Sequence, residues 1–282
     1  MNAENDRARA YRVGSTMARE RIEREAPLDA EALRRVQAAD ILVVPGGYDR
    51  VEQVLDALGT PYTPVSPMAL DRARLRPDQL VVVNCPGHLE RGLVEKLGTF
   101  VREGGSLFTT DWALLHVLEP AFPGVVAYNH RATADDVVRI EVRSRDNPFL
   151  AGVMDGRDDP VWWLEGSSYP IRILDPARVE VLLASRELAE RYGEEPVALT
   201  FREGEGEVFH MISHYYLQRT ELRTARHAAP APEYFAEKKM NMSPRTAREA
   251  EGLSVGDVES AATSARFLAN ILAKKKRRSD RR

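Results

Sequence analysis

Three short strand patterns constrain the fold of this chain more than any other feature. Ile41–Val44 and Leu80–Val83 are wholly apolar, and the third strand is expected at Ser106–Thr109. A wholly apolar run of four residues is typical of a parallel strand that is covered on both faces. The stretches after the first two runs repeat apolar residues every three or four positions, as amphipathic helices do. The order therefore predicts an α/β fold with a mainly parallel sheet and helices on both faces.

The second half of the chain is richer in strand patterns. We expect strands at Val137–Val142, Tyr169–Leu174, Val179–Ala184, Pro196–Phe201 and Glu207–Ser213. Their short connections indicate antiparallel pairing, and a Gly-Glu-Gly sequence at residues 204–206 predicts a tight turn that joins the last two strands as a hairpin.

We expect five segments along the chain. They are an N-terminal helical arm at residues 1–39, an α/β domain at 40–220, an irregular excursion at 221–253, a helix at 254–273 that packs on the domain, and a basic disordered tail at 274–282. The excursion is low in apolar residues and contains three prolines, and Ser254 is a suitable N-cap for the helix that follows.

The distribution of charge limits the classes of partner. The net charge is −3, but the tail at 274–282 holds seven basic residues and one acidic residue, which leaves 33 basic and 42 acidic residues in the rest of the chain. Nucleic-acid binding by the acidic body is disfavoured, so only the basic tail is expected to touch anionic partners. No apolar run approaches the roughly 18 residues that span a bilayer, and the N-terminus has no apolar signal core, so we expect a cytoplasmic protein.

The predicted sheet also places a candidate ligand site. Ligands of open parallel sheets bind at the carboxyl ends of the strands, where the loops at residues 45–49, 84–88 and 110–112 are expected to converge. The candidate ligand-binding residues there are Gly46, Gly47, Tyr48, Asn84, Cys85, Gly87, Trp112 and Tyr215. This set suits a small polar ligand or a partner protein. No dinucleotide or P-loop signature occurs, and we expect no cofactor.

Asp111 and His214 are the candidate catalytic residues. Asp111 stands where a buried strand bends into a helix, so its carboxylate is placed as a base, a nucleophile or simply the N-cap of that helix. His214 follows a late strand and can pair with Asp111. His210 lies four residues before His214 and faces the same side of that strand, but about 13 Å of strand would separate the two histidines. We therefore expect no metal. Cys85 is either an inert buried thiol or, if it is exposed, a reactive one.

Several motifs together resemble the class I glutamine amidotransferase-like superfamily, and especially its trehalose-utilisation (ThuA-like) branch. The motifs are "ILVVPGGYD" at 41–49, "LVVVNCPG" at 80–87, "GGSLFTTDWA" at 104–113, "DNPFLAGV" at 146–153 and "EEPVALTFREGEGEVFHMISHYY" at 194–216. The resemblance covers roughly residues 40–220 and implies a flavodoxin-like α/β domain.

The same resemblance implies where catalytic residues would stand. Active amidotransferases carry a cysteine at the elbow, a histidine after the late strand and a glutamate two residues beyond it. Here the elbow carries Asp111, the histidine corresponds to His214, and Tyr216 replaces the glutamate. Cys85 lies in an earlier loop, so glutaminase chemistry is not expected.

Two functions remain open from the sequence. One is a non-glutaminase member of this fold, a pseudoenzyme that binds a ligand or assembles with a partner protein or with a second copy of itself. The other is a small-molecule hydrolase or isomerase that uses Asp111 and His214 on a carbohydrate-like substrate.

Overall fold

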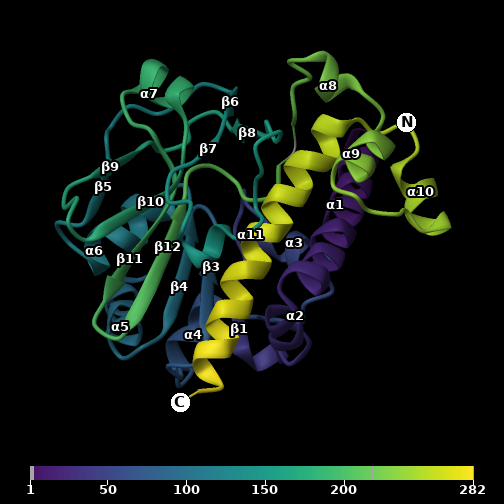
Figure 1. The fold of residues 1–282 in the computed structure, drawn as a ribbon. Coiled ribbons are helices and arrows are strands. Elements are labelled where there is room, and N and C mark those ends of the chain that lie inside the picture. Colours follow the sequence, from purple (N-terminus) through teal and green to yellow (C-terminus); the bar gives the residue numbers. More distant parts are fainter. Residues whose placement is uncertain (1–2, 218, 282) are drawn as a thin grey trace.

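An eight-stranded mixed sheet forms the centre of the molecule (Figure 1). The structure is a computed structural model and describes residues 3–217 and 219–281. The strand order is β2-β1-β3-β4-β12-β11-β10-β7. The strands are β1 (Ile41–Val44), β2 (Thr63–Pro64), β3 (Leu80–Val83), β4 (Ser106–Thr110), β7 (Glu141–Val142), β10 (Val179–Ala184), β11 (Pro196–Glu203) and β12 (Gly206–Met211).

The direction of the strands confirms the predicted fold class. From β2 to β12 the neighbouring strands run parallel, and from β12 to β7 they run antiparallel. The strands β1, β3 and β4 are buried throughout, because helices cover both faces of this part of the sheet. The predicted hairpin is also present, with β11 and β12 joined at Gly204 and Glu205.

Helices flank the parallel strands on both sides. On one face α3 (Val51–Leu58) contacts the long helices α1 (Ala3–Glu25) and α11 (Val255–Ser279). On the other face α5 (Arg91–Arg102) contacts α4 (Pro67–Arg72) and α6 (Glu119–Ala121). Further helical segments before residue 220 are α2 (Pro27–Arg34), η1 (Ala38–Asp40), η2 (Leu114–Leu118), η3 (Pro148–Leu150) and α7 (Arg186–Tyr192).

The expected strand at Val137–Val142 is interrupted in the structure. Its first part is β6 (Asp136–Arg139), which pairs with β8 (Val161–Leu164) outside the large sheet, and its second part is β7. Ile140 separates the two: its backbone N–H still donates to Pro160 O in register with the β6–β8 pairing, and from Glu141 the chain pairs with β10 instead. The expected strand at Tyr169–Leu174 is shorter, as β9 (Ile171–Ile173), and pairs with β5 (Val126–Tyr128).

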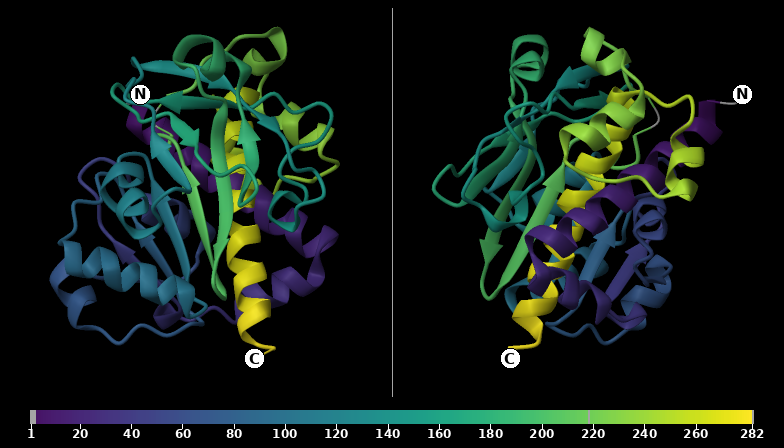
Figure 2. Two further views of the ribbon diagram at one scale, coloured as in Figure 1. Left: turned by 90° about the vertical axis from the view of Figure 1, so that its left-hand side faces the viewer. Right: turned by 45° about the vertical axis from the view of Figure 1, so that its right-hand side comes forward.

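The first and last described helices lie side by side (Figures 1 and 2). They approach closely at Gly14, where an added Cβ would stand 2.6 Å from Ala262 N. Tyr11, Met17 and Ile22 of α1 are buried, so this helix belongs to the core and is more than the arm expected at residues 1–39. Ser254 caps α11 as expected, since its hydroxyl accepts from Asp257 N.

The expected disorder of residues 274–282 is wrong for most of that segment, because α11 continues to Ser279. A run of like charges repels itself in isolation, but acidic residues from the first part of the chain neutralise this one. Lys274 and Arg277 each donate to Asp29, both at 2.7 Å, and Lys276 donates to Asp40 at 3.1 Å.

The excursion at 221–253 is likewise more ordered than expected. It contains α8 (Ala225–Ala228), α9 (Ala231–Glu237) and α10 (Pro244–Ala250). Arg226 donates to Glu237 and to the buried Glu259 of α11 and so ties these short helices to the core. None of the helices in the described ranges is long and apolar enough to cross a membrane.

Candidate functional site

Asp111 occupies a strained bend directly after β4. Its φ is 45°, a left-handed conformation that non-glycine residues rarely adopt and that clusters at functional sites. Its carboxylate is buried and accepts from Tyr169 N at 2.8 Å and from the Ser168 hydroxyl at 3.2 Å. The side chain therefore does not cap the helix that follows, and the N-cap alternative is wrong.

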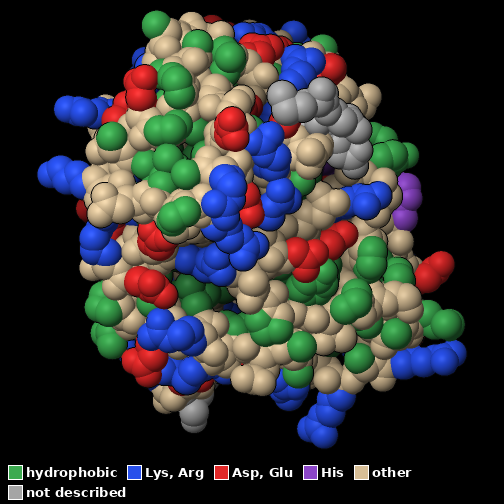
Figure 3. Space-filling view, turned by 90° about the vertical axis from the view of Figure 1, so that its right-hand side faces the viewer, with side chains coloured by type: hydrophobic (Ala, Val, Ile, Leu, Met, Phe, Trp, Pro, Cys, Tyr) green, Lys and Arg blue, Asp and Glu red, His purple; other side chains and the backbone are tan. Residues whose placement is uncertain are grey.

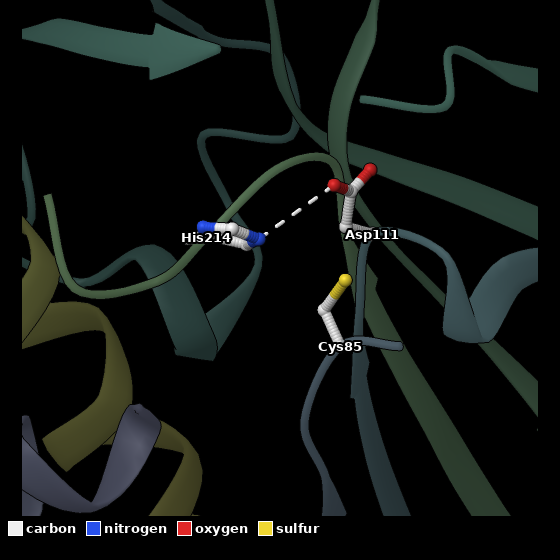
Figure 4. Close-up of side chains that lie close together, drawn as sticks. All are labelled: Cys85, Asp111 and His214. Carbon is white, nitrogen blue, oxygen red and sulfur yellow. Dashed lines mark ion pairs between the residues drawn. The ribbon is translucent and has the colours of Figure 1, made fainter. Parts of the chain in front are cut away.

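His214 reaches Asp111 because β12 runs parallel to β4. Thr110 lies opposite Met211 in the register, so the residues just beyond both strands emerge at the same edge of the sheet. The imidazole Nε2 stands 3.8 Å from Asp111 Oδ2, and each side chain is 3% exposed. Figure 4 shows the two side chains facing one another.

Glu165 completes this arrangement and was not predicted from the sequence. Its carboxylate contacts His214 Nδ1, on the side of the ring away from Asp111. The loop after β8 is fixed to the loop after β12, since Glu165 N donates to the Ser213 hydroxyl at 3.0 Å. The available signal was an acidic residue directly after the apolar run of β8, with Gly166 behind it.

The thiol of Cys85 also belongs to this centre (Figure 4). Ligand atoms of Cys85, Asp111 and His214 lie within 4.8 Å of one another, and all three residues are buried. Burial and the negative charge of Asp111 raise the pKa of the thiol well above its usual range, so it stays protonated and is a weak nucleophile.

A thiolate, a carboxylate and an imidazole are also a donor set that zinc accepts. If this centre holds a metal, Cys85, Asp111 and His214 would be its ligands. His210 is buried elsewhere, with Nδ1 2.8 Å from the Thr109 hydroxyl, and burial lowers its pKa to about 3.

Burial dominates the electrostatics of Asp111. Removal from water raises the pKa of this carboxyl to about 7, against the opposing effects of the Tyr169 N–H, His214 and the Ser168 hydroxyl. A carboxyl with such a pKa changes protonation state near neutral pH, which is the property of a general acid or base.

A line of aromatic side chains, here called the aromatic strip, adjoins the elbow. It consists of Tyr48, Trp112, Tyr169 and Tyr128, with ring centroids 5.5, 5.3 and 3.9 Å apart in that order. Tyr48 is 52% exposed and the other rings are half-buried. The indole N–H of Trp112 donates to Ser167 O at 2.7 Å, which fixes the ring beside Asp111.

Several residues predicted to touch a ligand have structural roles instead. Tyr215 is in the core and donates to Ser264 O at 2.7 Å. Asn84 is buried, accepts from Val51 N and donates to Val44 O, so it links β1, β3 and α3.

Two of the predicted glycines are needed for packing. An added Cβ at Gly46 would stand 2.1 Å from Cys85 O, and one at Gly87 would stand 2.8 Å from Ala113 Cβ. Of the predicted ligand-binding set, Gly47 and Tyr48 are exposed and Trp112 is half-buried. The prediction of ligand contact therefore remains open for these three and for Cys85.

The adjacent tryptophans of β8, Trp162 and Trp163, are both buried, because β8 is covered on both of its faces. Trp163 donates to Asp135 at 2.7 Å, and its ring lies 6.1 Å from that of His214.

Comparisons with known proteins give only distant similarities. Neither a family model nor a curated protein matches the chain. A glutamine amidotransferase from Thermotoga maritima aligns at 11% identity over 85% of this chain and 99% of its own, with a TM-score of 0.48. A β-galactosidase from Rahnella sp. R3 aligns at 13% identity over 63% of this chain, with a TM-score of 0.44.

An exo-β-1,4-mannosidase from an Opitutaceae bacterium aligns at 12% identity over 78% of this chain and 36% of its own, with a TM-score of 0.45. The chain spans only 27 to 30% of the length of these β-galactosidases. These similarities assign no activity to this chain, and membership of the ThuA-like branch stays a prediction.

Proposed function

We propose that this protein is an enzyme that performs acid–base chemistry, as a hydrolase or isomerase, on a small hydroxyl-rich molecule of carbohydrate type. The observation that supports this most is the alignment of Asp111, His214 and Glu165, a buried carboxylate that faces a histidine whose other nitrogen contacts a second carboxylate. A carboxylate on the far nitrogen orients an imidazole and stabilises its protonated form, as in catalytic triads.

The roles follow from these positions. Asp111 changes protonation near neutral pH and is the group that takes or gives the proton at the substrate. His214 Nε2, 3.8 Å away, serves the second proton transfer, with a substrate hydroxyl or a water between the two groups. Glu165 contacts only His214 in this centre and is a positioning residue.

The aromatic strip supports a carbohydrate-type substrate. Aromatic rings present large apolar faces at low entropy cost, and sites for small polar ligands combine such faces with a few polar groups. Trp112 and Tyr169 stack beside the carboxylate that Tyr169 N holds. The substrate enters, in this proposal, under the loop at residues 165–169, whose Gly166 and Ser167 are exposed.

The protonated thiol of Cys85 separates this proposal from glutamine hydrolysis. Its raised pKa and its buried position remove the nucleophile that glutaminase chemistry requires. The protein is therefore expected to leave glutamine intact.

The test is a survey of mono- and disaccharides incubated with the protein in D₂O and followed by proton NMR, which detects both hydrolysis and exchange at carbon. Asp111→Asn and His214→Gln should each lower turnover about 100-fold or more, because each removes a proton-transfer group. Asn tolerates the left-handed conformation of residue 111, so the first variant keeps the bend.

Glu165→Gln should lower kcat with little change in KM, as expected of a residue that acts through His214. His116→Asn is the control, because His116 contacts His88 and not this centre. Full turnover by Asp111→Asn would contradict the proposal. The absence of turnover or exchange with every saccharide would favour the ligand-binding alternative. If dialysis against a chelator abolishes activity and zinc restores it, the catalysis is metal-assisted at Cys85, Asp111 and His214 and the acid–base proposal is wrong.

A further inference from the structure

A separate cavity of about 800 Å³ opens between α1, α3 and the loop after β12. Its lining is Arg7, Ala8, Tyr11, Arg12, Tyr48, Arg50, Gln53, Asp56, Ala57 and Tyr216. The volume lies within the range of small-molecule sites. Of the lining residues only Tyr48 also belongs to the aromatic strip, through its contact with Trp112.

The charge of the lining favours an anion. Three arginines face the cavity against one acidic residue, Asp56, and the hydroxyl of Tyr62 already binds that carboxylate. In the described ranges Arg50 makes no ion pair, and Arg12 Nε stands 3.4 Å from Glu249 Oε2. Figure 3, which shows the right-hand side of Figure 1, has lysine and arginine side chains gathered across the middle of that face.

Arg7 is partly exposed, but its Nε is buried and incompletely paired. Its side chain is 11% exposed, and among the described residues its Nε has no hydrogen-bond partner. One terminal nitrogen donates to the Thr220 hydroxyl at 3.3 Å, and the other stands 3.7 Å from Asp257. Buried polar groups are normally satisfied, so a guanidinium with spare donors at a cavity wall calls for an acceptor from outside the chain.

The aromatic part of the lining suits a ring. Tyr11 and Tyr216 stack with their centroids 4.4 Å apart and form one wall. The backbone behind this wall is fixed, since the buried Asp49 accepts from Tyr215 N at 3.0 Å. A preformed wall lowers the entropy that a ligand has to give up on binding.

We propose that this cavity binds a small molecule that combines a ring with an oxyanion, a phosphate ester or a carboxylate. The guanidinium groups of Arg7 and Arg50 hold the oxyanion, because planar forks of donors match its geometry. The tyrosine wall packs against the ring. This site goes beyond the proposed function and does not depend on it, because none of its lining residues belongs to the centre of Asp111 and His214.

Calorimetric titration with glucose 6-phosphate at low ionic strength tests the site, with glucose as the neutral comparison. We expect saturable binding at one site, competition by inorganic phosphate, no measurable binding of glucose at the same concentration, and weaker binding as salt is added. Arg7→Gln and Arg50→Gln should each weaken binding about 10-fold or more, because each removes a charge-assisted hydrogen bond.

Arg50 is exposed, so its variant is informative even if Arg7→Gln fails to fold. Arg91→Gln is the matched control, because that side chain is 92% exposed on α5 and away from the cavity. Asp111→Asn should bind as the unchanged protein does, which separates this proposal from the proposed catalysis. The proposal is overturned by a lack of saturable binding, by full binding in Arg50→Gln, or by an equal loss in Arg91→Gln.

Discussion

At the scale of single residues, the bend at Asp111 holds a carboxyl in a buried environment that disfavours its charged form. Its pKa is about 7 in the folded protein against 3.8 for an ordinary aspartate. Between these values the folded protein keeps a proton that the unfolded chain releases. The contribution of this proton to stability is complete below about pH 4 and is lost as the pH rises through about 7.

Asp111→Asn should remove that dependence. Between about pH 4 and pH 7 the free energy of unfolding of the unchanged protein is expected to fall by about 1.4 kcal/mol for each unit by which the pKa of Asp111 is raised. The variant should show a flatter profile over the same interval, because an amide does not titrate. Urea unfolding at several pH values measures this, and parallel profiles for the two proteins would show that Asp111 is not the residue responsible.

The residues of the site were predictable only in part. Asp111 could be placed at the carboxyl edge because it follows a predicted parallel strand, and His214 was paired with it as the histidine after a late strand. The strand before His214 was predicted only as part of an antiparallel hairpin, so its parallel pairing with β4 comes from the structure. Glu165 was missed because β8 lies outside the large sheet, so no strand order deduced from the sequence brings it to the same edge. The burial of Tyr215 was also invisible, since it depends on α11, whose Ser264 O accepts its hydroxyl.

At the scale of elements, the crossing of α1 and α11 depends on the absence of a side chain at Gly14. A Cβ there would stand 2.6 Å from backbone Ala262 N, which no rotamer change relieves. Gly14→Val should therefore force the helices apart and cost about 1 to 3 kcal/mol.

Gly92→Ala is the matched control for this crossing. Gly92 lies in α5, and a Cβ added there would meet nothing within 4 Å. Alanine favours the helix by up to about 1 kcal/mol over glycine, so this variant should be as stable as the unchanged protein or slightly more so. Thermal unfolding followed by circular dichroism compares the two, and equal midpoints for Gly14→Val and Gly92→Ala would contradict the close crossing.

The elements of the sheet were easier to predict than their ends. Four-residue apolar runs marked β1 and β3, because strands covered on both faces leave no alternation to misread. The strand at Val137–Val142 did alternate, but the pattern could not show that the chain changes partner after Ile140, from β8 to β10 in the large sheet. Such divisions depend on contacts between distant segments.

At the scale of the whole molecule, acidic residues of the first part of the chain hold the basic end of α11 in place. Deleting residues 274–282 would leave Asp29, whose side chain is 4% exposed, without the cations of Lys274 and Arg277. We expect a loss of about 1 to 3 kcal/mol, the cost of leaving a buried polar group unpaired.

The same deletion combined with Asp29→Asn gives the sharper measurement. If the ion pairs carry the effect, the combined loss of unfolding free energy should be smaller than the sum of the two separate losses. If the deletion leaves the free energy of unfolding unchanged, residues 274–282 behave as the disordered tail that their composition suggested. Composition could not reveal this order, because the neutralising carboxylates lie more than 230 positions away in the chain.

The pairing of α1 with α11 also bears on how the protein is made. During synthesis α1 leaves the ribosome well before α11, the helix that covers its apolar side. Until α11 follows, Tyr11, Met17 and Ile22 have no complete partner surface, so the growing chain exposes these apolar residues. Chaperones that bind apolar segments therefore have a target in α1 until α11 packs on it.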